Sequence, residues 1–371
     1  MKQVTIIQRI LPHYRVPFFA ALHERLRDDA INLQVIFGQE LPGSTPTSIP
    51  VEASWAKAVH NRYWLGGRAV WQPCSKLLRR TDLVIVEHAN GALLNYALLL
   101  RRFLGTDKLL AFWGHGRNVQ RTGGAGEVVK SWMAKHADWW FTYTDSGVSD
   151  VAATGFPEER ITVVHNSIDT AALSRACASV TELEKTTLRE SLGLRGNNVC
   201  LYCGGMYANK KLDFLIEACV RIRKRVPDFE MLFVGHGPEQ YKVAQAAVVH
   251  DWIRYVGPRF GSELAAYYSL GKLLLIPGLV GLAILDSFVA GTPLITTDIP
   301  IHSPEISYLH DGVNGCVTSY DIEQFSAKVV GLLESNDSLN VLRAGCALAA
   351  QRYTIEQMQT MFAQGVRRCL R

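Results

Sequence analysis

The sequence predicts two α/β domains, each built around a doubly wound parallel β-sheet. Its 371 residues exceed the usual size of one hydrophobic core, and 48% of them are hydrophobic, which is enough for two. Short β-branched or aromatic runs alternate with amphipathic helical patterns along almost the whole chain, as in βαβ units. A polar stretch with few strand signals divides this alternation into two series.

Eleven runs carry the strand pattern. Six precede the polar stretch and five follow it: VTII, LQVIF, LVIVE, LLAFWG, WWFTYT and ITVVHN, then CLYCGG, MLFVG, IRYVG, LLLIP and PLITT. The intervening helices repeat apolar side chains at the helical period, at residues 18, 22 and 26 and at residues 214, 218 and 222. We therefore expect Rossmann-like domains over residues 1–166 and 199–353, a linker over 167–198, and a final helix over 354–371.

Composition excludes several classes of protein. The longest uncharged apolar run, residues 273–285, is broken by Pro277 and Gly278 and is shorter than the roughly 20 residues that a spanning helix needs, so no transmembrane helix is expected. The apolar run near the N-terminus is too short for a secretory signal. Eight scattered cysteines, including the close pair Cys200 and Cys203, indicate reduced thiols in a cytoplasmic protein.

The net charge of +5 arises entirely in the first half of the chain. Nineteen basic and 14 acidic residues precede Asn166, and twenty of each follow from there. Residues 53–81 hold no acid but six cations and four large aromatics: Lys57, Arg62, Arg68, Lys76, Arg79, Arg80, Trp55, Tyr63, Trp64 and Trp71. This pattern suits either a solvated basic face over core aromatics or contact with an anionic membrane surface. Nucleic acid is not an expected partner, because no nucleic-acid motif accompanies the charge.

The stretch LYCGGMYANKKLDFLIEA predicts a phosphate-binding turn between a strand and a helix. Gly204 and Gly205 let the backbone approach a ligand closely, and Lys210 near the helix start places positive charge on a diphosphate. A turn before a solvated helix is the plainer alternative. Neither a Gly-x-Gly-x-x-Gly motif after a strand nor a Walker A sequence is present, which disfavours nicotinamide and P-loop sites.

The stretch LLLIPGLVGLAILDSFVAGTPLITT predicts a second strand, loop and helix unit. The glycine-rich loop leaves backbone N–H groups facing an anion over a helix that starts near Gly281 and Leu282. Asp286 lies in the first turns of this helix, where its carboxylate suits a ribose diol, although an acid at that position also compensates the helix dipole.

These segments, together with MLFVGHGPE, IRYVGPR and HSPEISYLHDGVNG in the same order, resemble glycosyltransferase family 4 over most of the chain. The resemblance implies a GT-B fold, an N-terminal acceptor domain, a C-terminal domain that binds a nucleotide-sugar, and a final helix that crosses back to the N-terminal domain. It also implies transfer with retention of configuration and without a metal or other cofactor. In that family Lys210 would neutralise the leaving diphosphate, and Asp286 would replace the ribose-binding glutamate.

Two positions depart from the family pattern. The first of its two glutamates falls on Gly278, so the carboxylate that reads the donor sugar is missing. The arginine often found after the glycine-rich turn is replaced by Met206, which leaves the diphosphate to Lys210, with Arg259 as a second candidate. Glu305 either lies near the donor phosphates or starts a helix. No three side chains near it have the spacing of metal ligands, so no metal site is expected.

In the N-terminal half, LLAFWGHGRN places His115 directly after a strand, and the resemblance implies that it contacts the donor sugar. A histidine that only caps a turn is the alternative. Four further residues follow strands and are candidates for acceptor contacts or for core packing: His13, Tyr14, Arg15 and Asn90.

The sequence thus predicts a hexosyltransferase that uses a nucleotide-diphosphate sugar. It would act on a hydroxyl of a glycan, in particular a lipid-linked one, in bacterial surface-polysaccharide synthesis, as a cytoplasmic protein peripheral to the inner membrane face. Two alternatives remain open at this point: a nucleotide-sugar epimerase of the same fold, and a nucleotide-sugar-binding subunit without catalytic activity.

Overall fold

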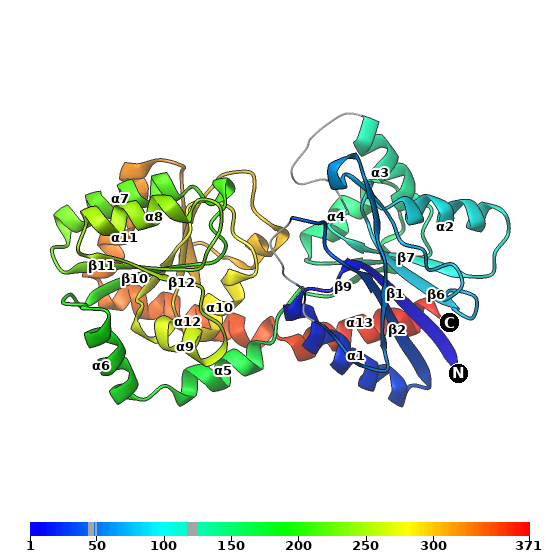
Figure 1. The fold of residues 1–371 in the computed structure, drawn as a ribbon, viewed down its shortest axis with the longest axis horizontal. Helices are drawn as coiled ribbons and strands as arrows, with labels where there is room; N and C mark the ends of the chain where they lie inside the picture. The colour runs from blue at the N-terminus through cyan, green and yellow to red at the C-terminus, as the bar shows by residue number, and fades with distance from the viewer. Residues whose placement is uncertain (44–47, 49, 117–124) are drawn as a thin grey trace. The chain divides into compact units, whose positions relative to one another are not determined.

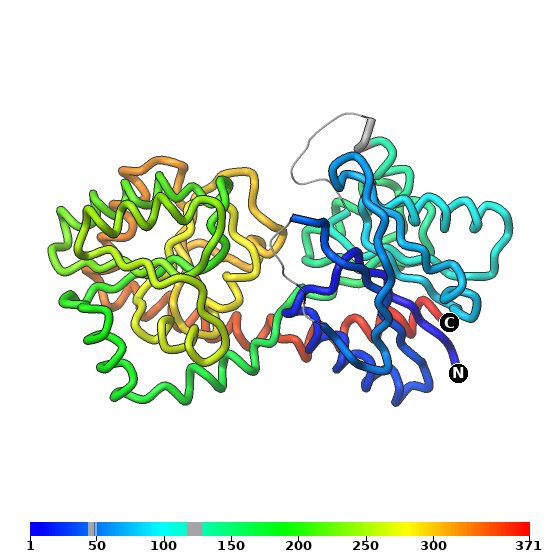
Figure 2. The backbone as a smooth tube through the Cα atoms, viewed as in Figure 1, coloured from blue at the N-terminus to red at the C-terminus, as the bar shows by residue number. Residues whose placement is uncertain are grey.

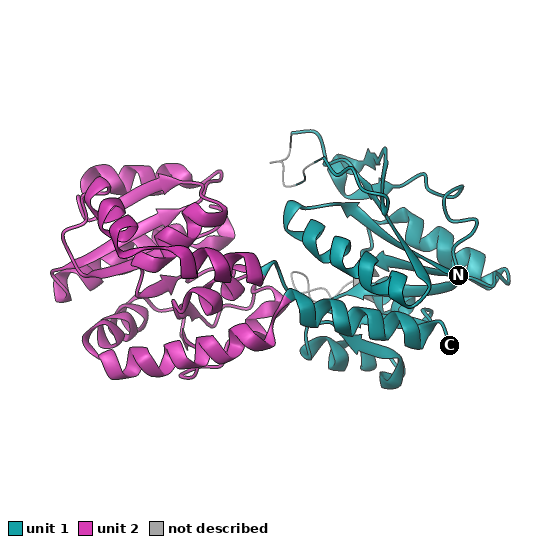
Figure 3. Cartoon of the chain, turned by 90° about the horizontal axis from the view of Figure 1, so that it is seen from below, with its two compact units in different colours: residues 1–169, 355–371 teal, residues 170–354 magenta. Residues whose placement is uncertain are grey.

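The computed structural model describes residues 1–43, 48, 50–116 and 125–371. The chain forms two compact units (Figure 3): residues 1–169 with 355–371, and residues 170–354. No helix in the described part is both long and apolar enough to cross a membrane.

The first unit contains a seven-stranded parallel sheet in the order β3-β2-β1-β6-β7-β8-β9 (Figure 1). Its strands are β1 (Lys2–Ile10), β2 (Ile31–Gly38), β3 (Ala56–Val59), β6 (Leu83–Glu87), β7 (Leu109–Gly114), β8 (Trp139–Thr142) and β9 (Ile161–Val163). A short antiparallel hairpin, β4 (Arg62–Trp64) and β5 (Ala69–Trp71), lies outside this sheet. The chain changes direction across the sheet between β1 and β6, which pair with Ile7 opposite Val86.

Helices cover both faces of this sheet. On one face α1 (Val16–Asp28) and the final helix α13 (Ile355–Cys369) bury Phe18 and Phe362 against the strands. On the other face lie α2 (Leu93–Phe103), α3 (Ala125–Lys135) and α4 (Ser146–Ala152). Short 3-10 turns η1 (His13–Arg15), η2 (Leu65–Gly67) and η3 (Glu158–Arg160) complete the unit. Both chain termini therefore belong to the first unit, where they lie near each other (Figure 2).

The second unit has a six-stranded parallel sheet in the order β12-β11-β10-β13-β14-β15. The strands are β10 (Asn198–Cys203), β11 (Phe229–Val234), β12 (Ile253–Gly257), β13 (Leu273–Leu275), β14 (Leu294–Thr297) and β15 (Gly315–Thr318). The inner strands β10, β11, β13 and β14 are almost entirely buried, as a parallel sheet covered on both faces requires, whereas the edge strands β12 and β15 are partly exposed. Its change of direction falls between β10 and β13.

Two layers of helices enclose the second sheet (Figure 1). One layer holds α7 (Leu212–Arg225), α8 (Gln240–Val249) and α11 (Ile322–Glu334). The other holds α5 (Thr170–Ser179), α6 (Glu182–Ser191), α9 (Gly261–Leu270), α10 (Ala283–Ala290) and α12 (Asn336–Arg352). The 3-10 turns η4 (Ala208–Lys210) and η5 (Pro304–Tyr308) follow β10 and β14.

The predicted fold class is confirmed, and each of the eleven predicted runs contains a strand. The predicted apolar helix faces are buried in α1 and α7. Four short strands, β3, β4, β5 and β15, were not predicted. Residues 170–198, expected to be a linker, instead form α5, α6 and the start of β10 within the second unit, because α5 packs on α9 and α10.

Candidate functional site

In the second unit, the loops after β10 and β13 meet where the sheet changes direction. Open α/β sheets bind ligands in the crevice outside the carboxyl ends of two such strands, because their connections leave to opposite faces. The loop after β10 carries Gly204, Gly205 and Lys210, and the loop after β13 carries Gly278 and Gly281. The fold thus brings together the two segments that the sequence predicts to bind a donor.

Close backbone packing joins these two loops. A Cβ added to Gly278 would lie 2.3 Å from the carbonyl oxygen of Asn209 and 2.3 Å from the carbonyl carbon of Lys210. The Leu279 N–H donates to the same Asn209 carbonyl at 2.8 Å. A side chain at position 278 therefore has no room unless the loops separate. The loop arrangement is therefore compatible with glycine at this position and not with a glutamate.

Lys210 holds a partly buried ammonium at this junction. Its Nζ donates to the Leu279 carbonyl at 2.5 Å, which orients the side chain across the two loops. Burial lowers the Lys210 pKa to about 8, and no carboxylate pairs with the ammonium among the described residues. A desolvated cation without an anionic partner is suited to receive an anionic ligand.

Asp286, in the first turn of α10, lies beside the buried thiol of Cys203 and the ring of Tyr268. Burial raises the Asp286 pKa to about 7. No hydrogen bond or ion pair holds its carboxyl group within the described chain. Both carboxyl oxygens are thus available to accept hydrogen bonds from a polyol.

His302 secures the loop after β13, a function that the sequence did not suggest. Its Nδ1 accepts a hydrogen bond from Val280 N–H at 3.1 Å, and its Nε2 donates to the Thr297 carbonyl at 2.7 Å. Burial lowers the His302 pKa, which agrees with this neutral tautomer. Thr297 Oγ1 adds a bond to the Pro277 carbonyl at 2.6 Å. Together these contacts fix the loop on the end of β14.

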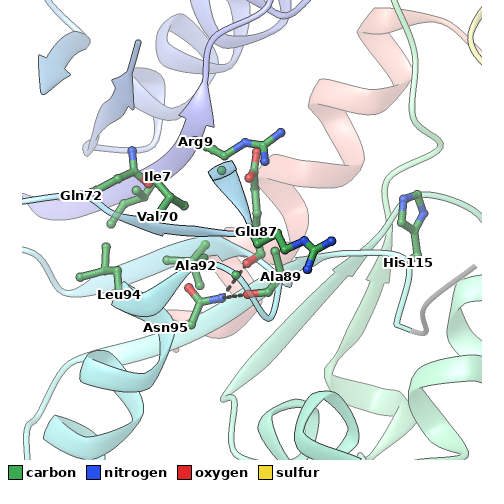
Figure 4. A pocket seen from close by; sticks show the side chains of 14 residues that line it. Ile7, Arg9, Val70, Gln72, Glu87, Ala89, Ala92, Leu94, Asn95 and His115 are labelled. Carbon is green, nitrogen blue, oxygen red and sulfur yellow. Dashed lines mark hydrogen bonds between the residues drawn. The ribbon is translucent and has the colours of Figure 1, made fainter. Parts of the chain in front are cut away.

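In the first unit, a cavity of about 720 Å³ opens where β1 and β6 end, again at the point where the sheet changes direction (Figure 4). Its walls come from five segments: the ends of β1 and β6, the hairpin around β5, the start of α2, and the residues directly after β7. Its charged or titratable lining residues are Arg9, Arg68, Glu87 and His115. Burial raises the pKa of Glu87, whose carboxylate accepts a hydrogen bond from the Arg9 backbone N–H.

His115 follows β7 and lines this cavity. Its ring lies edge-on to Tyr143, with 4.6 Å between the ring centroids. Burial, with the charge of Lys130, lowers its pKa to about 4, so the imidazole is neutral at pH 7. The buried Nδ1 has no hydrogen-bond partner among the described residues.

Residues 197–335 match the family model described as "Glycosyl transferases group 1". Over 143 residues the chain is 27% identical to the alpha-D-kanosaminyltransferase of Streptomyces kanamyceticus, covering 37% of this chain and 36% of that protein. Over 302 residues it is 25% identical to D-inositol 3-phosphate glycosyltransferase 2 of Catenulispora acidiphila, covering 76% of this chain and 64% of that protein. The chain thus spans about a third to two thirds of the length of these relatives.

The fold is shared with Anabaena HepE, solved in complexes with UDP and with UDP-glucose. The TM-scores are 0.72 and 0.69, the identities 15% and 13%, and the alignments cover 99% of this chain and 100% of HepE. The chain therefore has the GT-B fold, and residues 197–335 are similar to group 1 glycosyltransferases.

The structure also places three residues that the sequence predicts for the donor site, Arg259, Glu305 and Leu282, and the buried residue Met206. Arg259 lies over the ring of Tyr267 and 3.8 Å from Glu263, on the wall of a second cavity between α6 and α9. Met206 is fully buried beneath the loop after β11. Glu305 is only 4% exposed within η5, and Leu282 caps the start of α10 beside Gly281.

Among the four predicted acceptor residues, Arg15 is placed in the core. Its side chain is only 6% exposed, and its guanidinium lies 4.9 Å from the Trp113 ring centroid and 3.8 Å from Met358 Sδ. Little of its surface is left for an acceptor, because α13 covers it. His13 and Tyr14 contact each other in η1, and Asn90 lies between two residues that line the cavity.

The sequence analysis missed Arg9, Arg68 and Glu87 as cavity residues. Glu87 had a readable signal, since it is the acid that ends the otherwise apolar strand LVIVE. No such signal marks Arg9 and Arg68 in the sequence, because only the pairing of β1 with β6 and the fold of the hairpin bring these two residues together. Among the described residues, no group of three or more His, Cys, Asp or Glu side chains could hold a metal ion.

Proposed function

We propose that the chain transfers a hexosyl group from a nucleoside-diphosphate sugar to an acceptor hydroxyl, with retention of configuration and without a metal or other cofactor. One observation carries this proposal. The Lys210 ammonium is partly buried, has no carboxylate partner, and lies where the loops after β10 and β13 meet. A diphosphate supplies the missing negative charge.

The proposed reaction breaks the bond between the anomeric carbon and the diphosphate oxygen. The acceptor oxygen forms the new bond to this carbon, and the hydroxyl proton leaves with the released nucleoside diphosphate. Negative charge grows on the diphosphate and positive charge on the sugar ring in the transition state. Lys210 and the N-terminal N–H groups of α10 stabilise the leaving group.

Asp286 and His115 complete the proposed catalytic set. The carboxyl of Asp286 has no internal partner and is assigned to the ribose hydroxyls of the donor. The neutral imidazole of His115, with Nδ1 unpartnered, is assigned to the sugar being transferred. Because Gly278 leaves no room for a carboxylate, the donor sugar must be recognised by other groups. UDP and UDP-glucose, the ligands named for HepE, are the first donors to test.

The acceptor that we propose is a lipid-linked glycan of bacterial surface-polysaccharide synthesis, with the protein peripheral to the cytoplasmic membrane face. An exposed apolar surface in the first unit supports this. It comprises Leu100, Phe103 and Leu104 from the end of α2 and Val128 and Trp132 from α3. Phe103 stacks on Trp132, with ring centroids 5.9 Å apart. The exposed cations Arg101 and Lys135 on the same helices favour anionic lipid.

Vesicle sedimentation tests the membrane proposal. The protein should pellet with anionic vesicles at low salt, and the double substitution Phe103→Ser with Trp132→Ser should abolish pelleting. Val248→Ser removes a still more exposed apolar side chain from α8 in the second unit and serves as the control. Equal pelleting of the double variant and the control would contradict the assignment of this surface.

A thermal-shift screen of uridine, guanosine and adenosine diphosphate sugars tests donor recognition, because a ligand that binds only the folded state raises the unfolding temperature. We expect one nucleotide class to raise it, and the Lys210→Ala variant to lose most of the shift. Turnover of that variant should fall at least about 100-fold with the fold intact. Near-normal turnover would refute the role of Lys210. Epimerisation of the donor without any acceptor would replace the transferase proposal.

A further inference from the structure

The geometry points to a phosphate-binding site in the cavity of the first unit, formed by Arg9, Arg68 and the start of α2. We propose that this site binds a phosphate group on the acceptor. The inference rests on the proposed function, because it assigns the acceptor to this unit, and it adds the chemical class that the acceptor must carry.

The cavity lies where its sheet is built to bind a ligand. Ile7 and Arg9 near the end of β1 and Val86 and Glu87 at the end of β6 line it. These two strands flank the change of direction in the sheet. The crevice outside such strand ends is the usual ligand position in open α/β sheets. The cavity volume of about 720 Å³ is within the range of small-molecule sites.

Two guanidinium groups at the cavity have no hydrogen-bond partner among the described residues, although the charge of Arg9 acts on the nearby Glu87 carboxylate. Arg9 and Arg68 both line it, and neither guanidinium donates a hydrogen bond or forms an ion pair to any described residue. A planar guanidinium matches a phosphate edge with two parallel hydrogen bonds. A phosphate offers three or more oxygens in different directions and a larger negative charge than a carboxylate, so it suits two guanidinium groups better.

The start of α2 supplies further positive potential to the same cavity. Ala92, Leu94 and Asn95 from its first turn line the cavity, and this turn has neither a side-chain cap nor an acidic residue. Its free N–H groups and helix dipole favour an anion. The hairpin is fastened to this turn, since Val70 N–H donates to the Gly91 carbonyl at 2.8 Å. Arg68 is thereby held on the same wall.

Glu87 indicates that the ligand carries hydroxyl groups as well as a phosphate. Its carboxylate is fixed by the Arg9 backbone N–H, and Asn95 Nδ2 donates to the Glu87 backbone carbonyl at 2.9 Å (Figure 4). The Arg9 charge offsets part of the effect of burial on the Glu87 pKa, so the carboxylate lies near this guanidinium, although no salt bridge joins the two groups among the described residues. A carboxylate next to a phosphate site accepts hydrogen bonds from hydroxyls of the same ligand. The site therefore suits a phosphorylated polyol or sugar.

Equilibrium dialysis with radiolabelled inorganic phosphate tests this site in the full chain. The Lys210→Ala background removes phosphate binding at the proposed donor site. In that background, we expect Arg9→Gln and Arg68→Gln each to weaken phosphate binding at least about tenfold. Arg25→Gln removes an exposed arginine of α1 outside the cavity and should leave binding unchanged. Equal binding by the cavity variants and the Arg25 variant would overturn the inference.

A gain of binding provides a test that misfolding cannot mimic. Glu87→Gln removes the negative charge beside the site and should tighten phosphate binding several-fold. Weaker or unchanged binding in this variant would contradict the placement of the anion beside Glu87. Binding of UDP, GDP and ADP to the chain with wild-type Lys210 is measured in parallel. If none of UDP, GDP and ADP binds while phosphate binding still depends on Arg9 and Arg68, the proposed function is refuted. If a nucleotide binds but phosphate binding does not depend on Arg9 and Arg68, this inference alone is refuted.

Competition identifies the source of the phosphate. Three unlabelled compounds compete in turn with the radiolabelled phosphate: a soluble sugar phosphate, a lipid-linked sugar phosphate in detergent micelles, and the same sugar without phosphate. Displacement by a phosphate-bearing compound supports the inference, and displacement by only the micellar form identifies a lipid-linked acceptor. Displacement by the neutral sugar at the same concentration would overturn it.

Discussion

The pH dependence of nucleotide binding tests the role of Lys210 in most detail. Lowering the Lys210 pKa from 10.5 to about 8 corresponds to about 3 kcal/mol of unfavourable free energy for its charged form. A bound diphosphate favours the charged form and restores a higher pKa. Nucleotide binding is therefore coupled to proton uptake above pH 8, and affinity must fall as pH rises.

The expected fall is about tenfold between pH 7.5 and 9. Other titratable groups at the site do not change charge in this window. Asp286, with a pKa of about 7, is already mostly ionised, Cys203 has a pKa of about 12, and His302 has a pKa lowered below its usual value. Lys210 is therefore the source of the expected slope.

Isothermal titration with the nucleoside diphosphate that binds best in the screen measures this slope. Lys210→Arg keeps a charge that does not titrate in this range, so its affinity should be independent of pH above 8. Lys210→Ala should bind at least about tenfold more weakly at pH 7.5, also without a slope. A flat profile for the wild-type protein, or an unchanged slope in the Lys210→Arg variant, would refute the reasoning.

Three further predictions follow from the packing of individual residues. Asp286→Asn should weaken nucleotide binding roughly tenfold. It should also raise the free energy of unfolding by about 2 kcal/mol at pH 8. The reason is that a carboxyl group whose pKa is raised in the folded state destabilises that state as pH rises from 4 to 7. An unchanged midpoint of urea unfolding would contradict this prediction. Gly278→Glu should lower the free energy of unfolding by about 3 kcal/mol or more without improving activity, since the new Cβ would lie 2.3 Å from backbone atoms. Gly331→Ala is the control, because position 331 in α11 has open space around it. This variant should leave the free energy of unfolding unchanged or raise it in the same urea titration. Arg15→Ala should lower the free energy of unfolding by about 2 kcal/mol and leave kcat/KM unchanged; a selective loss of kcat/KM would show an acceptor role instead.

The long strands and the amphipathic helices could be predicted from the sequence because both leave a local pattern. Most of the predicted strands, such as β6, β11 and β13, contain a continuous apolar run, as buried parallel strands do. The strands β3, β4 and β5 are three or four residues long and partly exposed, so they leave no such pattern. Helix α6 had a readable signal that was overlooked, since Thr181 and Glu184 form a capping box.

Parts of the candidate site could be proposed from the sequence, namely those whose residues lie within a single loop or helix turn. Lys210 and Asp286 could be proposed from the sequence because each follows a strand in a glycine-rich context. The obstacle at Gly278 could not be seen, since it arises from backbone about 70 residues earlier in the chain. The Arg9, Arg68 and Glu87 site depends on which strands are neighbours, and no local pattern records that.

The most direct test of donor recognition is a crystal structure of the full chain with a bound nucleoside diphosphate. We predict a diphosphate oxygen within about 3 Å of Lys210 Nζ and the ribose hydroxyls on the Asp286 carboxylate. A nucleotide bound in any other place, with Lys210 still donating only to the Leu279 carbonyl, would contradict the account.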